Sequence, residues 1–402
     1  MKNNISDNKA LRACTGCGIC ASVCGVKAVS LEFDIEGFYK PVVDEEKCVE
    51  CGLCKKSCYR YDMDLVMSDS VVGCYAATNK DERQLIQSSS GGISRLLMEE
   101  CISKGYKVLG CAYDLSENIA KSIIVSSLEE LDQFYGSKYF QSYTVEGFRE
   151  VLRDNSEQKY ALFGTPCQIY GFAKSSKYRR NSSRYLLVDI FCHGCPTKKL
   201  WNQYCKCMSQ QLGSAVFSKI AFRTKTYGWH EYCIDFFGEK EKVCSNKSND
   251  PFFELFFGAD VMNRACYDCK IRSTIHYADI RIGDYWGAKY ELNTKGVSAV
   301  IIRSMLGKMF IDSVKAKMIV EKADFYHIIS AQSYGKSYVC DEKRRSFLMK
   351  GLDNKSLDIY ELNRSYRKML PVKMRIKKNL KSLVKMMPQN FYFSIRRILH
   401  SI

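Results

Sequence analysis

A cysteine pattern that occurs twice within the first sixty residues constrains this chain more than any other feature. The run CTGCGICASVC at 14–24 returns as CVECGLCKKSC at 48–58. Each run has the spacing C-x2-C-x2-C-x3-C, which winds a short loop around a [4Fe–4S] cube and sends its fourth cysteine to the other cluster of a pair. We therefore predict two clusters, one bound by Cys14, Cys17, Cys20 and Cys58 and the other by Cys24, Cys48, Cys51 and Cys54.

A pair of zinc sites is the main alternative for these eight thiols, because Cys-x-x-Cys also suits zinc. Two identical runs of four cysteines fit that alternative poorly. Gly16, Gly18 and Gly52 lie inside the loops, where backbone N–H groups that approach the sulfurs tune the potential of a bound cluster. The pattern therefore favours iron–sulfur chemistry over zinc.

The chain has 21 cysteines in 402 residues. Whether they form disulfides or bind metals depends on the redox compartment. The first residues of the chain show no apolar signal core, and no later stretch approaches the roughly 18 uninterrupted apolar residues of a membrane span. We therefore expect a reducing, cytoplasmic setting, in which clustered cysteines serve as metal ligands rather than as disulfides.

The formal net charge of +17 is concentrated at the C-terminal end, where residues 364–402 hold eleven Lys or Arg and no acidic residue. Without this segment the charge is about +6. At helical spacing, residues 372–387 present a basic face, which predicts peripheral contact with an anionic membrane. A basic helix packed on the body, or a partly disordered end, is the alternative. No nucleic-acid recognition motif accompanies the charge, so nucleic acid is not an expected partner. The apolar stripe opposite the basic face consists of Met374, Leu380, Leu383, Val384 and Met387.

The sequence pattern divides the chain into three parts. Residues 1–62 form a cysteine-rich head with a strand–turn–strand segment that bends at Gly37. Residues 70–340 form a body, with an N-terminal part at 70–150 and a C-terminal part at 155–340. Helical segments there alternate with apolar strands at 106–114, 159–164 and 184–192, which is typical of an α/β fold. Residues 341–402 are interpreted as a basic, partly helical tail.

The head resembles the bacterial two-cluster ferredoxin module, which implies low-potential, one-electron carriers. The body resembles the family of beta subunits of coenzyme F420 hydrogenases and dehydrogenases over roughly residues 70–290. The following segments carry this resemblance, in the order of the family: QSSSGGI (87–93), SKYFQS (137–142), FGTPCQIYGF (163–172), LVDIFCHGCPTKKLW (187–201), CYDCKIR (266–272) and ADIRIGDYWG (278–287).

These resemblances imply an α+β ferredoxin-like head followed by an α/β flavin-binding body, to which the sequence pattern adds the basic helical tail. The resemblance of the body implies a flavin, FAD or FMN, that exchanges a hydride with coenzyme F420 or another two-electron partner and passes single electrons to iron–sulfur centres. Relatives include chlorophyll reductases, and some bacterial members look like accessory proteins of polysaccharide biosynthesis.

Four of the family segments supply candidate cofactor-binding residues, and three of them have a physical rationale besides the resemblance. Ser and Gly at the start of a helix offer free N–H groups to a phosphate or to the flavin. A loop directly after a strand lies at the ligand-binding edge of an α/β sheet, and aromatics beside glycine suit a stacked ring. An ordinary Ser N-cap, a Pro turn and a buried aromatic corner are the respective alternatives. The candidates are Ser89, Ser90, Gly91, Gly92, Lys138, Gln141, Thr165, Pro166, Gln168, Asp284 and Trp286, with Arg223 and Lys225 as further basic residues.

A third cluster is expected from the thiols of Cys167, Cys192, Cys266 and Cys269, with Cys195 as an alternative ligand. The competing interpretation is that they are buried free cysteines, which pack as small hydrophobes. His193 and Cys167 are the candidate catalytic residues, since a histidine titrates near neutrality and can donate a proton. His230 is a second candidate, and a structural histidine is the alternative for both.

These expectations combine into one leading function. We expect an iron–sulfur flavoprotein oxidoreductase that relays electrons between a ferredoxin or another redox protein, its clusters and a flavin acting on a small-molecule substrate. The alternatives are an accessory protein of cell-surface polysaccharide assembly and a non-catalytic electron-relay subunit. The expected location is the cytoplasm, with membrane association through the tail as a further expectation.

Overall fold

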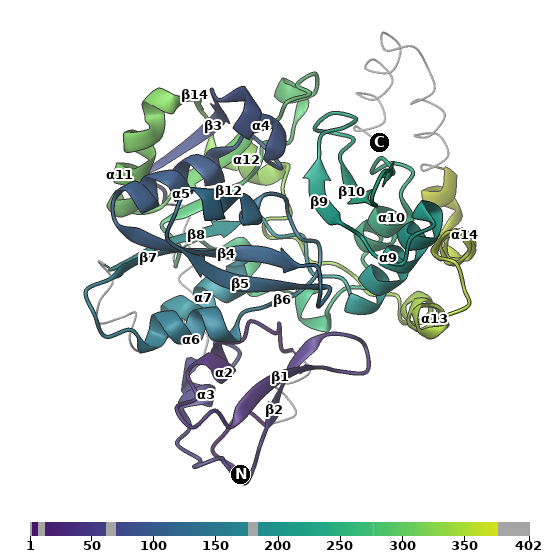
Figure 1. Cartoon of the computed structure of the whole chain (residues 1–402), viewed down its shortest axis with the longest axis horizontal. Helices are drawn as coiled ribbons and strands as arrows, with labels where there is room; N and C mark the ends of the chain where they lie inside the picture. Colours follow the sequence, from purple (N-terminus) through teal and green to yellow (C-terminus); the bar gives the residue numbers. More distant parts are fainter. Residues whose placement is uncertain (1, 7–12, 62–69, 176–183, 276, 377–402) are drawn as a thin grey trace.

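The computed structural model describes residues 2–6, 13–61, 70–175, 184–275 and 277–376. The head lies at one end of the molecule, against the layer of the body that contains α6 and α7 (Figure 1). Its strands β1 (Val29–Phe33) and β2 (Tyr39–Val43) form the antiparallel hairpin expected from the sequence, in the register Val29–Val43 to Phe33–Tyr39. The turn is at Gly37, whose φ is +78°.

Two short helices of the head begin at glycines in the left-handed region. Gly18 precedes α2 (Ile19–Ser22) with φ +81°, and Gly52 precedes α3 (Leu53–Ser57) with φ +71°. A Cβ at Gly18 would lie 2.1 Å from Thr144 Oγ1, so the head also needs glycine there to dock on the body. Glycine meets both demands, because it reaches this backbone conformation at no steric cost.

The body is built on a nine-stranded sheet in the order β14-β3-β13-β12-β8-β7-β4-β5-β6. Strands β12, β8, β7 and β4 run parallel to one another at its centre, and β13, β3, β14 and β5 are joined by antiparallel pairing. The strands are β3 (Gly73–Asn79), β4 (Tyr106–Asp114), β5 (Ile119–Val125), β6 (Ser142–Tyr143), β7 (Lys159–Gly164), β8 (Tyr185–Ile190), β12 (Ile280–Asp284), β13 (Ser298–Ile302) and β14 (Met318–Lys322).

Helices cover both faces of this sheet. Helices α5 (Ile93–Ser103) and α11 (Met305–Val314) pack on one face, and α6 (Val145–Arg153) and α7 (Pro166–Lys174) pack on the other (Figure 1). The strands expected at 106–114, 159–164 and 184–192 are present as β4, β7 and β8. The shorter helices around the sheet are α4 (Glu82–Gln87), α12 (Phe325–Ser330), η1 (Glu129–Phe134), η3 (Arg264–Cys266), η4 (Lys270–Ser273), η5 (Ala288–Tyr290) and η6 (Lys315–Lys317).

A second hydrophobic core joins a small sheet to four helices. Strands β9 (Lys219–Thr224), β10 (Cys233–Phe237) and β11 (Lys242–Val243) pack with α9 (Lys198–Leu212), α10 (Pro251–Phe257), α13 (Glu342–Asp353) and α14 (Ile359–Met369). Aromatic rings dominate this core: Trp201, for example, stacks on Phe140 with ring centroids 4.7 Å apart.

The tail begins later in the chain than the predicted boundary at residue 341, because α13 and α14 pack in this second core. The charge of the residues from 341 onward assigns them to the tail, but α13 and α14 bury Leu348, Ile359, Leu362 and Tyr366 in the second core. Amphipathic spacing within these charged helices explains the difference. Of the segment 372–387, only residues up to 376 are described, so most of the predicted apolar stripe lies outside the described residues.

The parallel strands β7, β8 and β12 end at the same edge of the large sheet. Their register aligns Gly164 with Asp189 and Arg281 with Asp189. In α/β sheets, ligands bind at the carboxyl ends of the strands. The loops that follow these three strands therefore meet where a ligand is expected.

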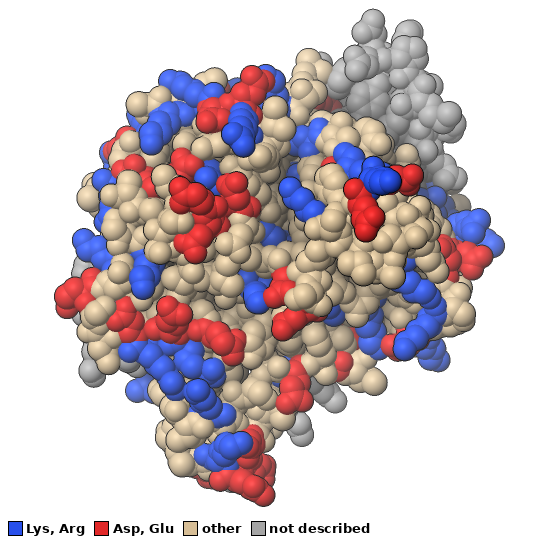
Figure 2. Space-filling model, viewed as in Figure 1, with Lys and Arg blue, Asp and Glu red and all other residues tan. Residues whose placement is uncertain are grey.

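In the part of the chain that the structure describes, no helix has both the length and the apolarity needed to cross a membrane. On the face shown in Figure 2, acidic and basic side chains are interspersed over the body. The residues that dominate the net charge, 364–402, are described only as far as 376.

Asp250 makes stability depend on pH in the second core. Its fully buried carboxylate caps α10 by accepting the N–H groups of Phe252 and Phe253 at 2.8 and 3.2 Å, and it accepts the Tyr204 hydroxyl. Burial raises the pKa of Asp250 to about 7, against about 4 in an unfolded chain. Between these values the folded state binds more protons, so this group lowers stability as pH rises from 4 to 7.

The variant Asp250→Asn keeps a capping side chain but has no carboxyl to titrate. We therefore expect its stability relative to the wild type to be higher at pH 8 than at pH 5. The measurement is the urea midpoint at both pH values under anaerobic conditions. Asp358→Asn, which removes the N-cap charge of α14, is the matched control. Parallel pH profiles for wild type and Asp250→Asn would contradict the expectation.

Candidate functional site

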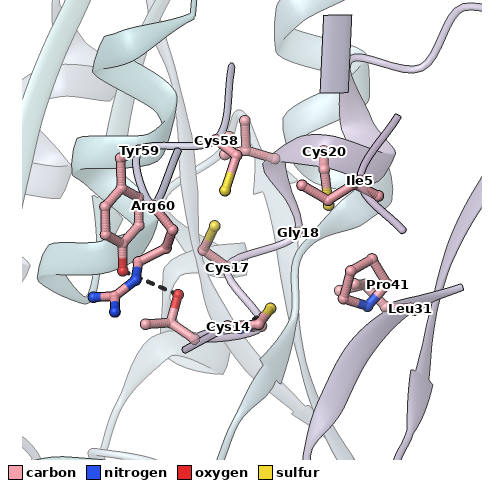
Figure 3. A pocket seen from close by; sticks show the side chains of 13 residues that line it. Ile5, Cys14, Cys17, Gly18, Cys20, Leu31, Pro41, Cys58, Tyr59 and Arg60 are labelled. Carbon is pink, nitrogen blue, oxygen red and sulfur yellow. Dashed lines mark hydrogen bonds between the residues drawn. The ribbon is translucent and has the colours of Figure 1, made fainter. Parts of the chain in front are cut away.

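The first thiol set consists of Cys14, Cys17, Cys20 and Cys58, the ligands predicted for the first cluster. The four side chains line one cavity and direct their sulfurs toward the same space (Figure 3). Burial and then the neighbouring thiols raise the pKa of Cys17 and Cys20 well above the usual value. Neighbouring thiolates repel one another, so these thiols do not ionise together in the absence of a cation. Bound iron offsets their negative charges. The apolar walls of the cavity include Ile5, Leu31 and Pro41.

The second thiol set consists of Cys24, Cys48, Cys51 and Cys54. Burial raises the pKa of Cys54, and the thiol of Cys24 adds to the effect, so these two lie close together. The backbone N–H of Ala28 donates to Cys24 Sγ at 3.2 Å, and Asn4 Nδ2 donates to Cys48 Sγ at 3.6 Å. Cys51 is exposed, so this set lies nearer to the surface than the first.

The spacing of the sulfurs distinguishes a cube from a zinc ion. A tetrahedral zinc with Zn–S bonds of about 2.3 Å would hold four sulfurs about 3.8 Å apart. Among the residues that the structure describes, only Cys233, Asp235 and Cys244 bring three potential ligand atoms within 4.8 Å of one another. All eight cysteines of the head are described, so their wider spacing favours a cube over a single ion.

The third thiol set lies at the carboxyl edge of the large sheet and consists of Cys167, Cys192, Cys195, Cys266 and Cys269. Cys167 lies in the first turn of α7, and Cys192 follows β8. Burial and the thiols of Cys167 and Cys269 raise the pKa of Cys192 to about 12. Burial and the thiols of Cys266, Cys192 and Cys167 raise the pKa of Cys195 well above its usual value. The structure therefore brings together the four predicted thiols and the alternative one.

The first and third thiol sets are neighbours across the contact between head and body. After burial, the thiol of Cys167 makes the largest contribution to the raised pKa of Cys17. Tyr59 of the head packs edge-on against Tyr170 of α7, with ring centroids 5.3 Å apart. A Cβ at Gly171 would lie 2.8 Å from Ile19 Cγ1 and 3.5 Å from Cys17 Sγ, so glycine allows α7 to approach α2.

Polar contacts hold the head in this position. Gln141 uses both ends of its amide: Oε1 accepts the N–H of Tyr39 at 2.8 Å, and Nε2 donates to the carbonyl of Thr15 at 2.8 Å. Gln141, a predicted cofactor-binding residue, thus uses its amide to join the head to the body. Arg345, which is 1% exposed, pairs with Glu36 of the hairpin at 2.6 Å.

The candidate Ser–Gly turn precedes α5, and part of it is tied to the large sheet. Ser90 Oγ donates to the carbonyl of Val297 at 2.9 Å, and Gly91 N donates to Ser298 Oγ at 3.0 Å. Ser89 Oγ accepts the N–H of Ser137 at 3.1 Å. Gly92 has φ +80° at the N-cap of α5, so this turn retains the backbone geometry of a helix N-terminus.

The loop after β7 forms an internal cap. Gln168 Oε1 accepts the N–H of Thr165 at 2.9 Å, and Gln168 Nε2 donates to Ser142 Oγ at 2.8 Å. Pro166 occupies the first turn of α7, where its missing N–H costs nothing. Thr165 Oγ1 lies 3.3 Å from Cys167 Sγ. These residues therefore position Cys167, and the amide of Gln168 is already engaged within the protein.

Asp284 and Trp286 lie together after β12. Asp284 Oδ1 accepts Trp229 Nε1 at 2.6 Å and Arg223 Nη2 at 3.0 Å. Trp286 stacks on Trp229 with centroids 5.0 Å apart. Lys225 donates to the carbonyl of Ser90 at 2.7 Å, so β9 connects the Ser–Gly turn to the end of β12.

The surroundings of His193 keep its ring uncharged, and those of Lys138 bind its ammonium group. Burial lowers the pKa of His193 to about 4, so its ring is neutral at pH 7, contrary to the expectation that it titrates near neutrality. His193 Nδ1 lies 2.9 Å from Tyr338 OH, whereas Nε2 has no partner within the described parts of the chain. Lys138 donates to the carbonyls of Gln133 and Tyr135 at 3.2 and 2.9 Å.

Comparison with known families agrees with this arrangement. Residues 157–326 match the family described as the C terminus of the beta subunit of coenzyme F420 hydrogenase/dehydrogenase, and residues 13–60 match the 4Fe-4S dicluster domain. Residues 157–326 therefore belong to this beta-subunit family, and residues 13–60 form a dicluster domain. The chain is therefore an iron–sulfur protein of electron transfer.

Relatives of this beta-subunit-like chain include the F subunit of F(420)H(2) dehydrogenase from Methanosarcina mazei, at 23% identity over 76% of this chain and 83% of that one. A segment 39% identical to the iron-sulfur A subunit of CoB–CoM heterodisulfide reductase from Methanocaldococcus jannaschii covers 12% of this chain and 10% of that one. A solved structure of the F420-reducing [NiFe] hydrogenase complex of Methanosarcina barkeri matches 77% of this chain and 97% of its own, at 18% identity and a TM-score of 0.47.

One part of the site in this beta-subunit-like chain was not predicted from its sequence. We call Arg223, Tyr232, Lys247, Phe257 and Trp286 the basic–aromatic cluster. The Arg223 guanidinium lies 3.6 Å from the ring centroid of Tyr232, and Lys247 Nζ lies 5.0 Å from it. Lys247 Nζ is also 5.6 Å from the Trp286 ring. These residues come from separate segments, and no local motif links them.

Proposed function

We propose that this chain is an oxidoreductase subunit in which electrons pass between the head and a flavin-dependent site at the carboxyl edge of the large sheet. The observation that carries the proposal is the succession of three thiol sets, from exposed Cys51, through Cys17, to Cys167 and Cys192. A redox protein would exchange electrons at the exposed second set, since that set lies nearest to solvent.

The residues around the first and third thiol sets fit a bound cluster. The first thiol set fits a cluster, because its cavity is apolar and the N–H of Gly16 donates to Cys14 Sγ at 3.3 Å. The third set fits a further cluster, because a [4Fe–4S] cluster needs four thiolates and this set has five. Bound clusters supply one-electron transfer, and a bound flavin supplies the exchange between one-electron and two-electron chemistry.

The residues around Asp284 fit a flat, anionic ligand of the flavin or deazaflavin class. The basic–aromatic cluster offers the ammonium of Lys247 and the guanidinium of Arg223, which is also paired with Asp284. Cations attract an anionic group, and the aromatic faces suit a flat ring. Two buried nitrogens, Arg223 Nε and His193 Nε2, have no partner among the described residues and are free to donate to or accept from a ligand. The name of the Methanosarcina mazei relative points to reduced coenzyme F420 as a two-electron partner.

A second candidate function is that of an electron-relay subunit without its own flavin. It is favoured by the amides of Gln141 and Gln168 and the ammonium of Lys138, which already bond to protein atoms. In that case the third thiol set passes electrons onward to a separate enzyme.

Anaerobic purification of the full chain tests both candidates. For the leading proposal we expect about twelve iron atoms and twelve sulfides per chain, four of each per cube, together with one flavin released by acid. We also expect a reduced deazaflavin to bleach the visible absorption of the clusters. The same iron content without flavin would support the relay, and zinc without acid-labile sulfide would contradict both.

A further inference from the structure

Three potential metal ligands outside the thiol sets share one face of the small sheet. Cys233 and Asp235 are two residues apart on β10, so their side chains point to the same side of the sheet. The pairing of Phe236 with Val243 places Cys244, directly after β11, opposite Asp235. The two sulfurs and a carboxylate oxygen lie within 4.8 Å of one another, the only such trio of His, Cys, Asp or Glu in the described ranges.

We propose that Cys233, Asp235 and Cys244 bind one zinc ion. Zinc with Zn–S bonds of about 2.3 Å and Zn–O bonds of about 2.1 Å holds sulfur and oxygen ligands about 3.6 Å apart. Cys233 Sγ and Asp235 Oδ1 are separated by 3.3 Å. This spacing suits a single ion, in contrast to the wider spacing of the thiol sets. Two thiolates with a carboxylate form a donor set of the borderline softness that zinc prefers.

The neighbouring residues orient the carboxylate for this role. Asp235 Oδ2 accepts Thr226 Oγ1 at 3.2 Å and Lys242 Nζ at 3.1 Å, which leaves Oδ1 turned toward Cys233. Metal-binding carboxylates are held by such outer hydrogen bonds. The charges also balance, because zinc and Lys242 together offset two thiolates and one carboxylate.

The site has an entry path for the ion. Cys233 is 0% exposed and Asp235 is 4% exposed, whereas Cys244 is half-buried. Cys244 Sγ lies 3.9 Å from the hydroxyl of Tyr227, a residue that is 54% exposed. The fourth position of the zinc therefore opens toward solvent and takes a water molecule.

The position of the ion gives it a structural task. Strand β11 has only two residues, and the zinc fastens its end to β10. Thr224 of β9 pairs with Cys233, and Arg223 of the basic–aromatic cluster is the preceding residue. The ion would thus hold the wall of that cluster, whether or not a flavin binds there.

Metal analysis of the full chain tests the proposal. After anaerobic reconstitution with iron and sulfide and a wash with a chelator, we expect about one zinc per chain. Zinc-edge X-ray absorption should show two sulfur and two oxygen neighbours, with Zn–S near 2.3 Å. Cys244→Ser and the isosteric Asp235→Asn should each weaken zinc binding, measured by chelator competition, by at least about 100-fold. Cys340→Ser is the control, because Cys340 is also half-buried but lies outside the trio.

Several results would overturn this assignment. These are a wild type without zinc, zinc in an all-sulfur shell that survives Cys244→Ser, and iron in place of zinc at the trio. A Cys233–Cys244 disulfide in anaerobic protein, found by thiol labelling and mass spectrometry, would also overturn it. Iron and sulfide are counted separately, so failure of the zinc site and failure of the cluster proposal are distinguishable.

Discussion

Replacing Cys192 and Cys195 together with alanine should lower the iron content from about twelve to about eight atoms per chain, four per cube lost. It should also slow electron transfer from the head to a two-electron acceptor by at least about 100-fold. Both residues belong to the third thiol set, in which burial and neighbouring thiols raise the pKa of Cys192 to about 12. The double variant is needed because Cys195, three residues further along, can replace Cys192 as a ligand.

The measurements are chemical iron and sulfide analysis, low-temperature EPR of the dithionite-reduced protein, and the rate at which a reduced viologen dye reduces a deazaflavin through the protein. EPR of the two head clusters should remain. Cys101→Ala is the matched control, because Cys101 is 0% exposed and its raised pKa arises from burial with no thiol beside it. An unchanged iron content in the double variant would show that these thiols do not hold a cluster.

Arg345→Met should destabilise the protein by about 3 kcal/mol, the lower end of the cost of removing one partner of a buried ion pair, because Arg345 is 1% exposed but the side chain of Glu36 is 27% exposed. The guanidinium donates to both oxygens of Glu36 at 3.1 and 2.6 Å and to the carbonyl of Met262 at 2.7 Å. Arg345 also lowers the pKa of Glu36, although burial of that carboxyl opposes the effect. Its loss leaves Glu36 without its main partner and loosens the hairpin that anchors the head.

Denaturant unfolding and hydrogen exchange of residues 29–43 measure this effect, and we expect the hairpin amides to exchange faster in the variant. Arg264→Met is the control: Arg264 contacts the same Glu36 at 3.6 Å but is 44% exposed, so its loss should cost less than about 1 kcal/mol. Equal losses in the two variants would mean that the buried pair has no special role. Glu36→Gln combined with Arg345→Met should recover part of the stability.

The parts of the molecule that could be predicted from the sequence are those fixed by local spacing. Cysteines three positions apart, with glycine between them, define a loop whatever surrounds it, so the grouping of Cys14, Cys17 and Cys20 followed directly. The approach of Cys58 to them came from the known interleaving of two such runs. The strands at 106–114 and 159–164 were found in the same way, from continuous apolar runs.

The parts that could not be predicted depend on contacts between distant segments. Arg345 and Glu36 are 309 positions apart, and neither residue shows in its own neighbourhood that it has a partner. Gln168 is a cofactor candidate because its loop directly follows a strand, and Gln141 because of the family resemblance. Neither segment reveals that in the folded chain both amides bond to backbone and hydroxyl groups nearby. The β10–β11 hairpin brings Tyr232 and Lys247 together, but Lys247 reaches Trp286 only because the small sheet lies beside the end of β12.

Gly171 matters for how closely the head and the body pack. Because any side chain at this position would press on Ile19 and Cys17, α7 could not keep its present distance from α2 with a larger residue there. In the function proposed above, electrons cross this contact within one chain. Such a transfer is intramolecular, so its rate would not depend on protein concentration, whereas exchange with an external redox protein would.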